Sequence, residues 1–236
     1  MKVTGLLEFF KKNNYEWEKD KEALGVICGL TKTRPDPNKK SGSFSYGQEQ
    51  PFLVKCVARA LKADSFFEIG TGRGTACYAV SLEQTIESIV TVDIIPHHQK
   101  KNEAIDYQPA NVSNADIYDM MPYEQKKKIS FKHTTDIPSI AEEMEGMFDL
   151  AFIDGNHTDL KTIIKDFYVC NKLVKEGGTI IFDDYYESKF AVKTVVDEVL
   201  KRNPSFKPEL VCFHGHLFDD PSRNQATDNG VMVIKK

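Results

Sequence analysis

From about residue 48 to the end of the chain, short continuous runs of apolar residues alternate with longer segments whose apolar residues recur at helical spacing. Short continuous apolar runs are typical of strands that are buried on both faces of a sheet. The alternation therefore predicts an α/β fold, with a parallel sheet that helices cover on both faces. The predicted strands are residues 66–69, 89–92, 129–133, 148–153, 179–182, 209–213 and 230–234.

Helices are predicted between these strands, at residues 51–61, 75–82, 137–144, 159–173 and 190–201. The last two strands are joined by a polar turn segment, which suits an antiparallel pairing at the end of the sheet. Residues 1–47 differ, because a short amphipathic helix there is followed by a turn-rich segment. We therefore predict an N-terminal helical and loop appendage over residues 1–47 and one α/β domain over residues 48–236, with an inserted loop at 95–125 near the site.

Composition limits the classes of partner. With 236 residues, 41% hydrophobic and 28% charged, the chain can bury a sizeable core. A net charge of -4 gives no electrostatic reason to expect a nucleic acid partner. No apolar run approaches the ~18 residues of a membrane span. The five cysteines are scattered, which predicts reduced thiols in a cytoplasmic protein.

A glycine-rich turn follows the first strand of the domain. The strand carries Glu68 and leads into Gly70-Thr71-Gly72-Arg73-Gly74, and Asp93 ends the next strand about 20 residues further on. Glycines let the backbone approach a ligand closely, and an acid at the second strand can bind ribose hydroxyls. This arrangement predicts an adenosine-bearing cofactor at the strand ends, although a structural turn without a ligand is an alternative.

The identity of that cofactor follows from what the turn contains. A phosphate-binding P-loop would need Lys followed by Ser or Thr at the helix start, and a dinucleotide site would need a third glycine where Thr75 stands. Glu68 instead suits a cofactor with an ammonium and a sulfonium, which is S-adenosylmethionine (SAM). With Asp93 in register, the pattern resembles motif I and the following acidic position of class I SAM-dependent methyltransferases.

The resemblance to that class implies more than the residues do. It implies a Rossmann-like, doubly wound, mostly parallel seven-stranded sheet whose last strand is antiparallel. It also implies that Asp136, after the third strand, meets the adenine amino group; a cap on the following helix is the alternative role for Asp136. The cofactor-binding residues would be Glu68, Gly70, Thr71, Gly72, Gly74, Asp93, Asp136 and Asp154.

A second group of acids follows the fourth and fifth strands. Asp154 ends one strand, and Asp183 and Asp184 end the next. Strand ends of a parallel sheet share one edge, and neighbouring strands lie about 4.8 Å apart. Three carboxylates so close would repel one another, and a divalent cation such as Mg²⁺ or Ca²⁺ would remove the conflict. Alternatively, Asp154 or Thr158 caps the next helix.

Asp154-x-x-His157 together with Gly177-Gly178 and Asp183-Asp184-Tyr185 resembles the metal-dependent small-molecule O-methyltransferases, especially the branch acting on macrolide sugars. The match covers residues 48–186. It implies that Asp154, Asp183 and Asp184 hold Mg²⁺, that His157 is the general base, and that Asp154 takes part in catalysis. A surface or capping role is the alternative for His157, and His97 and His98 are expected to be solvated.

We therefore predict a methyltransferase that uses SAM and Mg²⁺, or another divalent cation, to methylate a hydroxyl of a small-molecule acceptor. No nucleic acid or membrane partner is expected, and a monomer and a homo-oligomer both stay open. Two other classes remain. One is a metal-independent N- or C-methyltransferase, in which the acids accept hydrogen bonds. The other is a non-catalytic module that keeps the fold and binds the cofactor.

Overall fold

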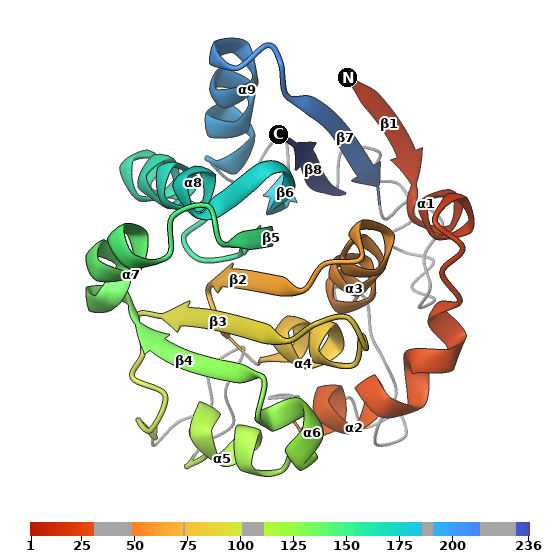
Figure 1. The fold of residues 1–236 in the computed structure, drawn as a ribbon, viewed down its shortest axis with the longest axis vertical. Helices are drawn as coiled ribbons and strands as arrows, with labels where there is room; N and C mark the ends of the chain where they lie inside the picture. Colours follow the sequence, from red (N-terminus) through yellow and green to blue (C-terminus); the bar gives the residue numbers. More distant parts are fainter. Residues whose placement is uncertain (31–48, 73, 101–110, 186–190, 213–229) are drawn as a thin grey trace.

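The computed structural model describes residues 1–30, 49–72, 74–100, 111–185, 191–212 and 230–236, with side chains omitted at 26–30. Its strands form one sheet of eight, in the order β1-β7-β8-β6-β5-β2-β3-β4 (Figure 1). All neighbouring strands are parallel except β8, which is antiparallel to β6 and β7. The strands are β1 (Lys2–Gly5), β2 (Ser65–Ile69), β3 (Ser88–Asp93), β4 (Ile129–His133), β5 (Phe148–Ile153), β6 (Val174–Tyr185), β7 (Lys207–Cys212) and β8 (Gly230–Lys235).

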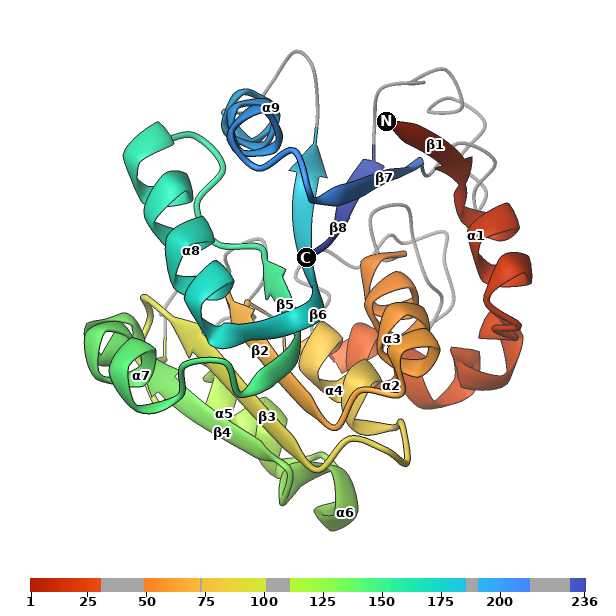
Figure 2. The ribbon, with the colours of Figure 1, turned by 45° about the horizontal axis from the view of Figure 1, so that its top comes forward.

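Helices lie on both faces of this sheet (Figures 1 and 2). One face packs against α3 and α4, and α7, α8 and α9 cover the other, so that each face has its own apolar core. The central strands β2 and β5 are mainly apolar because both of their faces are buried, although β2 carries Glu68 and β5 carries Asp149. The helices are α1 (Leu6–Lys12), α2 (Lys21–Leu30), α3 (Gln50–Leu61), α4 (Thr75–Ser81), α5 (Asn114–Asp119), α6 (Tyr123–Lys126), α7 (Ile137–Glu143), α8 (Leu160–Leu173) and α9 (Val192–Arg202), with 3₁₀ turns η1 (Trp17–Asp20) and η2 (Thr134–Asp136).

The predicted fold class is confirmed, including the reversed last strand, but the count of seven strands is wrong. Residues Lys2–Gly5 form an additional strand, β1, which pairs in parallel with β7 at the sheet edge. The hydroxyl of Thr4 donates to the Glu209 carboxylate over 2.6 Å and fixes the pairing. The N-terminal appendage therefore contributes to the sheet. Its expected boundary at residues 47 and 48 lies outside the described residues.

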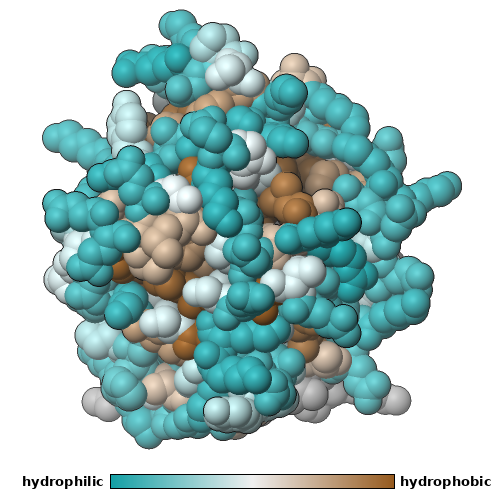
Figure 3. Space-filling view, in the orientation of Figure 1, coloured by the Kyte–Doolittle hydropathy of each residue, from teal (hydrophilic) through white to brown (hydrophobic). Residues whose placement is uncertain are grey.

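Two further expectations concern the loop at 95–125 and the cysteines. The loop contains the short helices α5 and α6, while its residues 101–110 lie outside the described ranges. The described cysteines at 56, 77, 170 and 212 are buried thiols that form no disulfide with one another, in accordance with the prediction of reduced thiols. Hydrophilic residues cover most of the face seen in Figure 3. No helix in the described ranges is long and apolar enough to cross a membrane.

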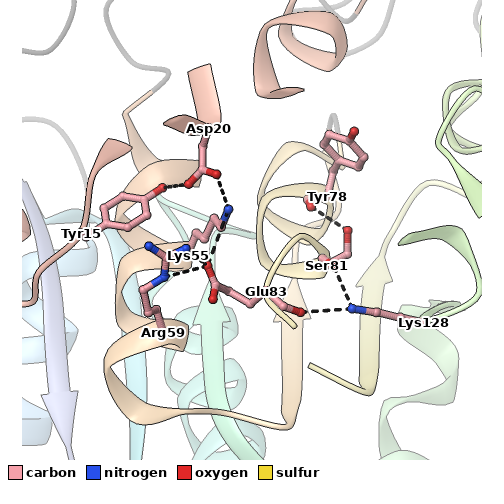
Figure 4. A network of polar contacts seen from close by, with 8 residues as sticks. All are labelled: Tyr15, Asp20, Lys55, Arg59, Tyr78, Ser81, Glu83 and Lys128. Carbon is pink, nitrogen blue, oxygen red and sulfur yellow. Dashed lines mark hydrogen bonds and ion pairs between the residues drawn. The ribbon is translucent and has the colours of Figure 1, made fainter. Parts of the chain in front are cut away.

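A buried polar network attaches the N-terminal segment to helix α3 (Figure 4). The Lys55 side chain is only 3% exposed, and its ammonium lies 2.5 Å from Asp20 and 3.6 Å from Glu83. The Tyr15 hydroxyl donates to Asp20 over 2.7 Å, and Arg59 donates to Glu83. These contacts join the segment around η1 to the helix whose first turn reaches the cavity described below.

Candidate active site

A cavity of about 540 Å³ opens at the carboxyl ends of β2, β3, β5 and β6. This is the edge where ligands bind in open α/β sheets. Six of its lining side chains are acidic, and among the described residues that line it there is no lysine or arginine. Such a wall favours ligands that carry positive charge. The acidic residues of the wall are Glu68, Asp93, Asp154, Asp166, Asp183 and Asp184.

The glycine turn after β2 forms part of this wall and requires its glycines. Gly70, Gly72 and Gly74 all have positive φ angles, of +96°, +47° and +72°. A Cβ atom at Gly70 would lie 2.1 Å from the backbone oxygen of Asp154, whereas a Cβ at Gly72 would meet nothing within 4 Å. The turn therefore contacts the loop after β5 at Gly70, and Gly72 faces open space.

The two acids that the sequence places beside this turn both line the cavity. The Glu68 carboxylate accepts hydrogen bonds from the Thr91 hydroxyl over 2.5 Å and from the Cys77 thiol over 2.7 Å. Burial raises the pKa of Glu68 to about 7, against the effect of these two donors. Asp93 accepts from the backbone N–H of Gly72 over 3.0 Å, and so holds the turn closed.

The acids after β5 and β6 come together as expected, because Ile153 and Phe182 are paired in neighbouring strands. Burial raises the pKa of Asp154 well above its usual range, and the charges of Asp183 and Asp184 raise it further. Burial, followed by the charge of Asp184, likewise raises the pKa of Asp183. The negative charges of these three carboxylates therefore repel one another, and a bound cation would relieve that repulsion.

His157 lies between the acids of the two strands. Its Nδ1 atom is 3.1 Å from Asp184 Oδ2, and its Nε2 atom is 3.9 Å from Asp154 Oδ1. Asp184 has a φ of +52°, which turns the chain just as β6 ends. About a third of the His157 side chain, 32%, stays exposed, and the residue lines the cavity. The arrangement leaves the imidazole accessible to a ligand.

The predicted Mg²⁺ site can be compared with the arrangement of possible metal-binding side chains. In the described part of the chain, no three or more His, Cys, Asp and Glu side chains are grouped in a way that could already hold a metal ion. The oxygens of Asp154, Asp183 and Asp184 are nevertheless the kind that Mg²⁺ prefers, and two of these acids have raised pKa values. The residues thus fit Mg²⁺ by chemistry, and an ion would have to draw them together.

Two alternatives raised by the sequence concern helix caps. Helix α8 is capped by Asp159, which accepts from the backbone N–H of Thr162 over 3.0 Å, so that Asp154 and Thr158 are not needed as its cap. Asp136 accepts from the backbone N–H of His133 over 3.0 Å and does not line the cavity. Its contact with the adenine stays a prediction.

Sequence reasoning missed Gln50 and Asp166. Gln50, in the first turn of α3, lines the cavity and donates to the Asp183 carboxylate over 3.2 Å. No local signal could have indicated it, because packing alone brings α3 to this edge. Asp166 is 6% exposed, and burial raises its pKa to about 6. It could have been found as an acid within the buried apolar stripe of Ile163 and Phe167.

Comparison with known proteins adds the family and the fold. A family model described as a methyltransferase domain matches residues 67–185, just over half of the chain. An uncharacterized protein of Acanthamoeba polyphaga mimivirus is 24% identical over 142 residues. That match spans 59% of this chain and only 60% of the viral protein.

Two solved structures resemble this one. The O-methyltransferase from Bacillus cereus in complex with SAH has 15% sequence identity and a TM-score of 0.53, over 92% of this chain and 90% of that chain. The O-methyltransferase TomG from Streptomyces achromogenes, involved in tomaymycin synthesis and in complex with SAM, has 16% identity and a TM-score of 0.58, over 91% and 89% of the two chains. At these identities the likeness shows the fold.

Proposed function

Because the chain belongs to the methyltransferase-domain family, we propose that it transfers a methyl group from SAM to a hydroxyl of a small-molecule acceptor, with Mg²⁺ or another divalent cation. One observation carries this proposal. One cavity is lined both by the glycine turn and by His157, which lies between the acids that follow two neighbouring strands. Donor and acceptor sites would therefore adjoin.

The cofactor end of the cavity suits a positively charged methyl donor. Glu68 and Asp93 supply negative charge beside the glycine turn, and Asp93 holds that turn through Gly72. The turn has no Cβ at Gly72, so a ligand can approach its backbone closely. Position and charge together would orient SAM, and alignment of the reacting atoms supplies much of the rate of such a transfer.

At the acceptor end, His157 is the side chain suited to receive the proton of the hydroxyl. Histidine is the commonest general base near neutral pH. Asp184, 3.1 Å from Nδ1, would hold the ring so that Nε2 faces the hydroxyl. Asp154, Asp183 and Asp184 would hold the divalent ion, which when bound lowers the pKa of a coordinated hydroxyl.

Replacing Gly72 by alanine tests the cofactor site. The structure leaves room for the new methyl group, so the variant should fold, with a loss of about 1 to 2 kcal/mol for the left-handed backbone. If SAM lies against the turn, its affinity should fall by about tenfold or more, because the close approach is lost. Calorimetry with S-adenosylhomocysteine (SAH) measures this affinity.

The matched control is Gly146→Ala. Gly146 also has a positive φ, of +64°, and open space around a new Cβ, but it lies in the turn between α7 and β5. It should lose similar stability and bind SAH like the wild type. Equal affinities of the two variants for SAH would contradict the proposal that the cofactor binds at the glycine turn. A wild-type protein that does not bind SAH would contradict the proposed function.

Chelation tests the proposed divalent cation, and the size of the labelled product tests the proposed small-molecule acceptor. Tritiated methyl groups from SAM should enter the small-molecule filtrate of a cell extract, EDTA should stop the transfer, and added Mg²⁺ should restore it. Asp183→Asn should also weaken Mn²⁺ binding, measured by electron paramagnetic resonance, by about tenfold or more. The control is Asp159→Asn, since asparagine caps a helix as well as aspartate does.

Other outcomes point to the alternatives. Transfer that persists in EDTA would indicate a metal-independent enzyme, and label on nitrogen or carbon would identify an N- or C-methyltransferase. Label retained with macromolecules would contradict a small-molecule acceptor. SAH binding without transfer to any fraction would favour a non-catalytic cofactor-binding module.

A further inference from the structure

His97 is buried, although the adjacent pair His97 and His98 was expected to be solvated. Only 8% of His97 is exposed, whereas His98 is exposed. The ring of His97 packs on Phe131 of β4, with centroids 4.4 Å apart. Burial lowers the pKa of His97, which favours the neutral imidazole. A neutral buried histidine needs hydrogen-bond partners, and those partners lead toward the cofactor turn.

A chain of hydrogen bonds runs from this ring to Glu68. His97 Nε2 lies 3.1 Å from the Thr71 hydroxyl, and that hydroxyl lies 2.7 Å from the hydroxyl of Thr91. The Thr91 hydroxyl then donates to Glu68 over 2.5 Å. All four side chains are buried, at 8%, 3%, 0% and 1% exposure in this order. Thr71 and Glu68 line the cavity, while His97 and Thr91 do not.

The hydrogen bond from Thr91 to Glu68 sets the donor and acceptor roles in the other two hydrogen bonds. Thr91 has one hydroxyl proton and uses it toward Glu68, so in its contact with Thr71 it must accept. Thr71 therefore donates its own proton to Thr91 and must accept from the imidazole. His97 then carries its proton on Nε2. Each group in this series of hydrogen bonds thus polarises the next, and the Glu68 carboxylate is the terminal acceptor.

We propose that His97 is a positioning residue of the cofactor site, which holds the Thr71 hydroxyl in the glycine turn and completes the chain that supports Glu68. The inference rests on the proposed use of SAM. It gives His97, at the start of the 95–125 segment, a role in supporting the binding site for the methyl donor. Without His97, the Thr71 hydroxyl would lack its donor and could turn away, and the turn and Glu68 would lose their fixed arrangement before the cofactor binds.

Calorimetry with SAH tests this role, because neither acceptor nor metal is needed. His97→Leu should raise the dissociation constant of SAH by about tenfold, the effect of leaving one buried hydrogen-bond partner unsatisfied. His97→Gln should restore most of the affinity, since its side-chain amide keeps an N–H donor near the place of Nε2. His98→Leu is the matched control, and its affinity should equal that of the wild type.

A double-mutant cycle tests whether the chain acts as one unit. Thr91→Val removes the central hydroxyl with little change of shape and without touching the cavity. If the chain is the cause, the His97→Leu and Thr91→Val effects on SAH affinity should be clearly less than additive. Additive effects on SAH affinity would indicate that His97 only packs against its neighbours. The same conclusion would follow if His97→Gln bound SAH as weakly as His97→Leu.

Two further results separate this inference from the proposed function. Wild-type affinity in His97→Leu would overturn the role of His97 and leave the cofactor proposal intact. Failure of the wild type itself to bind SAH would overturn both. Thermal unfolding of each variant without ligand shows whether a change in affinity merely follows a loss of fold.

Discussion

Gly70→Ala is expected to cost about 3 kcal/mol or more in the free energy of unfolding and to abolish detectable SAH binding. A Cβ at this position would lie 2.1 Å from the backbone oxygen of Asp154 and 2.9 Å from the backbone nitrogen of Gly155. The backbone cannot easily give way, because Gly70 donates to Val92 and Asp154 donates to Ile69, each over 2.8 Å. Urea unfolding and calorimetry measure the two effects.

Gly177→Ala separates the clash from backbone strain. Gly177 has a φ of +78°, and a Cβ added there would meet nothing within 4 Å, so only the strain of about 1 to 2 kcal/mol should appear. Similar losses in the two variants would show that the turn and the loop after β5 are not in tight contact. If the clash is real, Gly70 is where the proposed methyl-donor site contacts the loop that carries Asp154.

Lys55→Met is expected to lower the free energy of unfolding by about 3 kcal/mol, because it leaves the largely buried Asp20 carboxylate without its cation, while Glu83 keeps its ion pair with Arg59. Both acids are largely buried, with side chains 14% and 10% exposed. The N-terminal segment should also become more sensitive to limited proteolysis, since Asp20 holds that segment to α3 (Figure 4). Chemical denaturation gives the free energy.

The control for this variant is Lys172→Met. Lys172 lies 3.2 Å from Glu145, but the two side chains are 41% and 63% exposed, so the loss should stay within about 1 kcal/mol. Adding Asp20→Asn to Lys55→Met should cost less than the sum of the two single changes, because they remove the same contact. Equal losses in the free energy of unfolding for the two lysine variants would mean that the network does not stabilise the attachment of the N-terminal segment to α3.

Much of the fold followed from local signals. The strand at 148–153 is a mainly apolar run, interrupted by Asp149 and bounded by Asp154, and it was predicted with the bounds that β5 has. The glycine turn was recognisable because close backbone approach requires residues without a Cβ, and Gly70 shows that requirement directly. The reversed last strand was implied by resemblance, and β8 is antiparallel to both neighbours.

Other features could not be predicted because they depend on contacts between distant parts of the chain. Strand β1 is short, and only its pairing with β7, about 200 residues away in sequence, defines it as a strand. His97 looks like part of a polar loop, and its burial depends on Phe131 in β4. Lys55 reads as a surface lysine of a helix until Asp20 and Glu83 are brought beside it.

The sequence by itself determined the alternation of strands and helices, the glycine turn and the acids at the strand ends, because each depends on neighbouring residues and on their spacing. Tertiary structure decided how those acids are used. It brought Gln50 to Asp183 and connected His97 to Glu68 through two threonine hydroxyls. Hydrogen-bond partners across a fold are set by packing, which no local pattern contains.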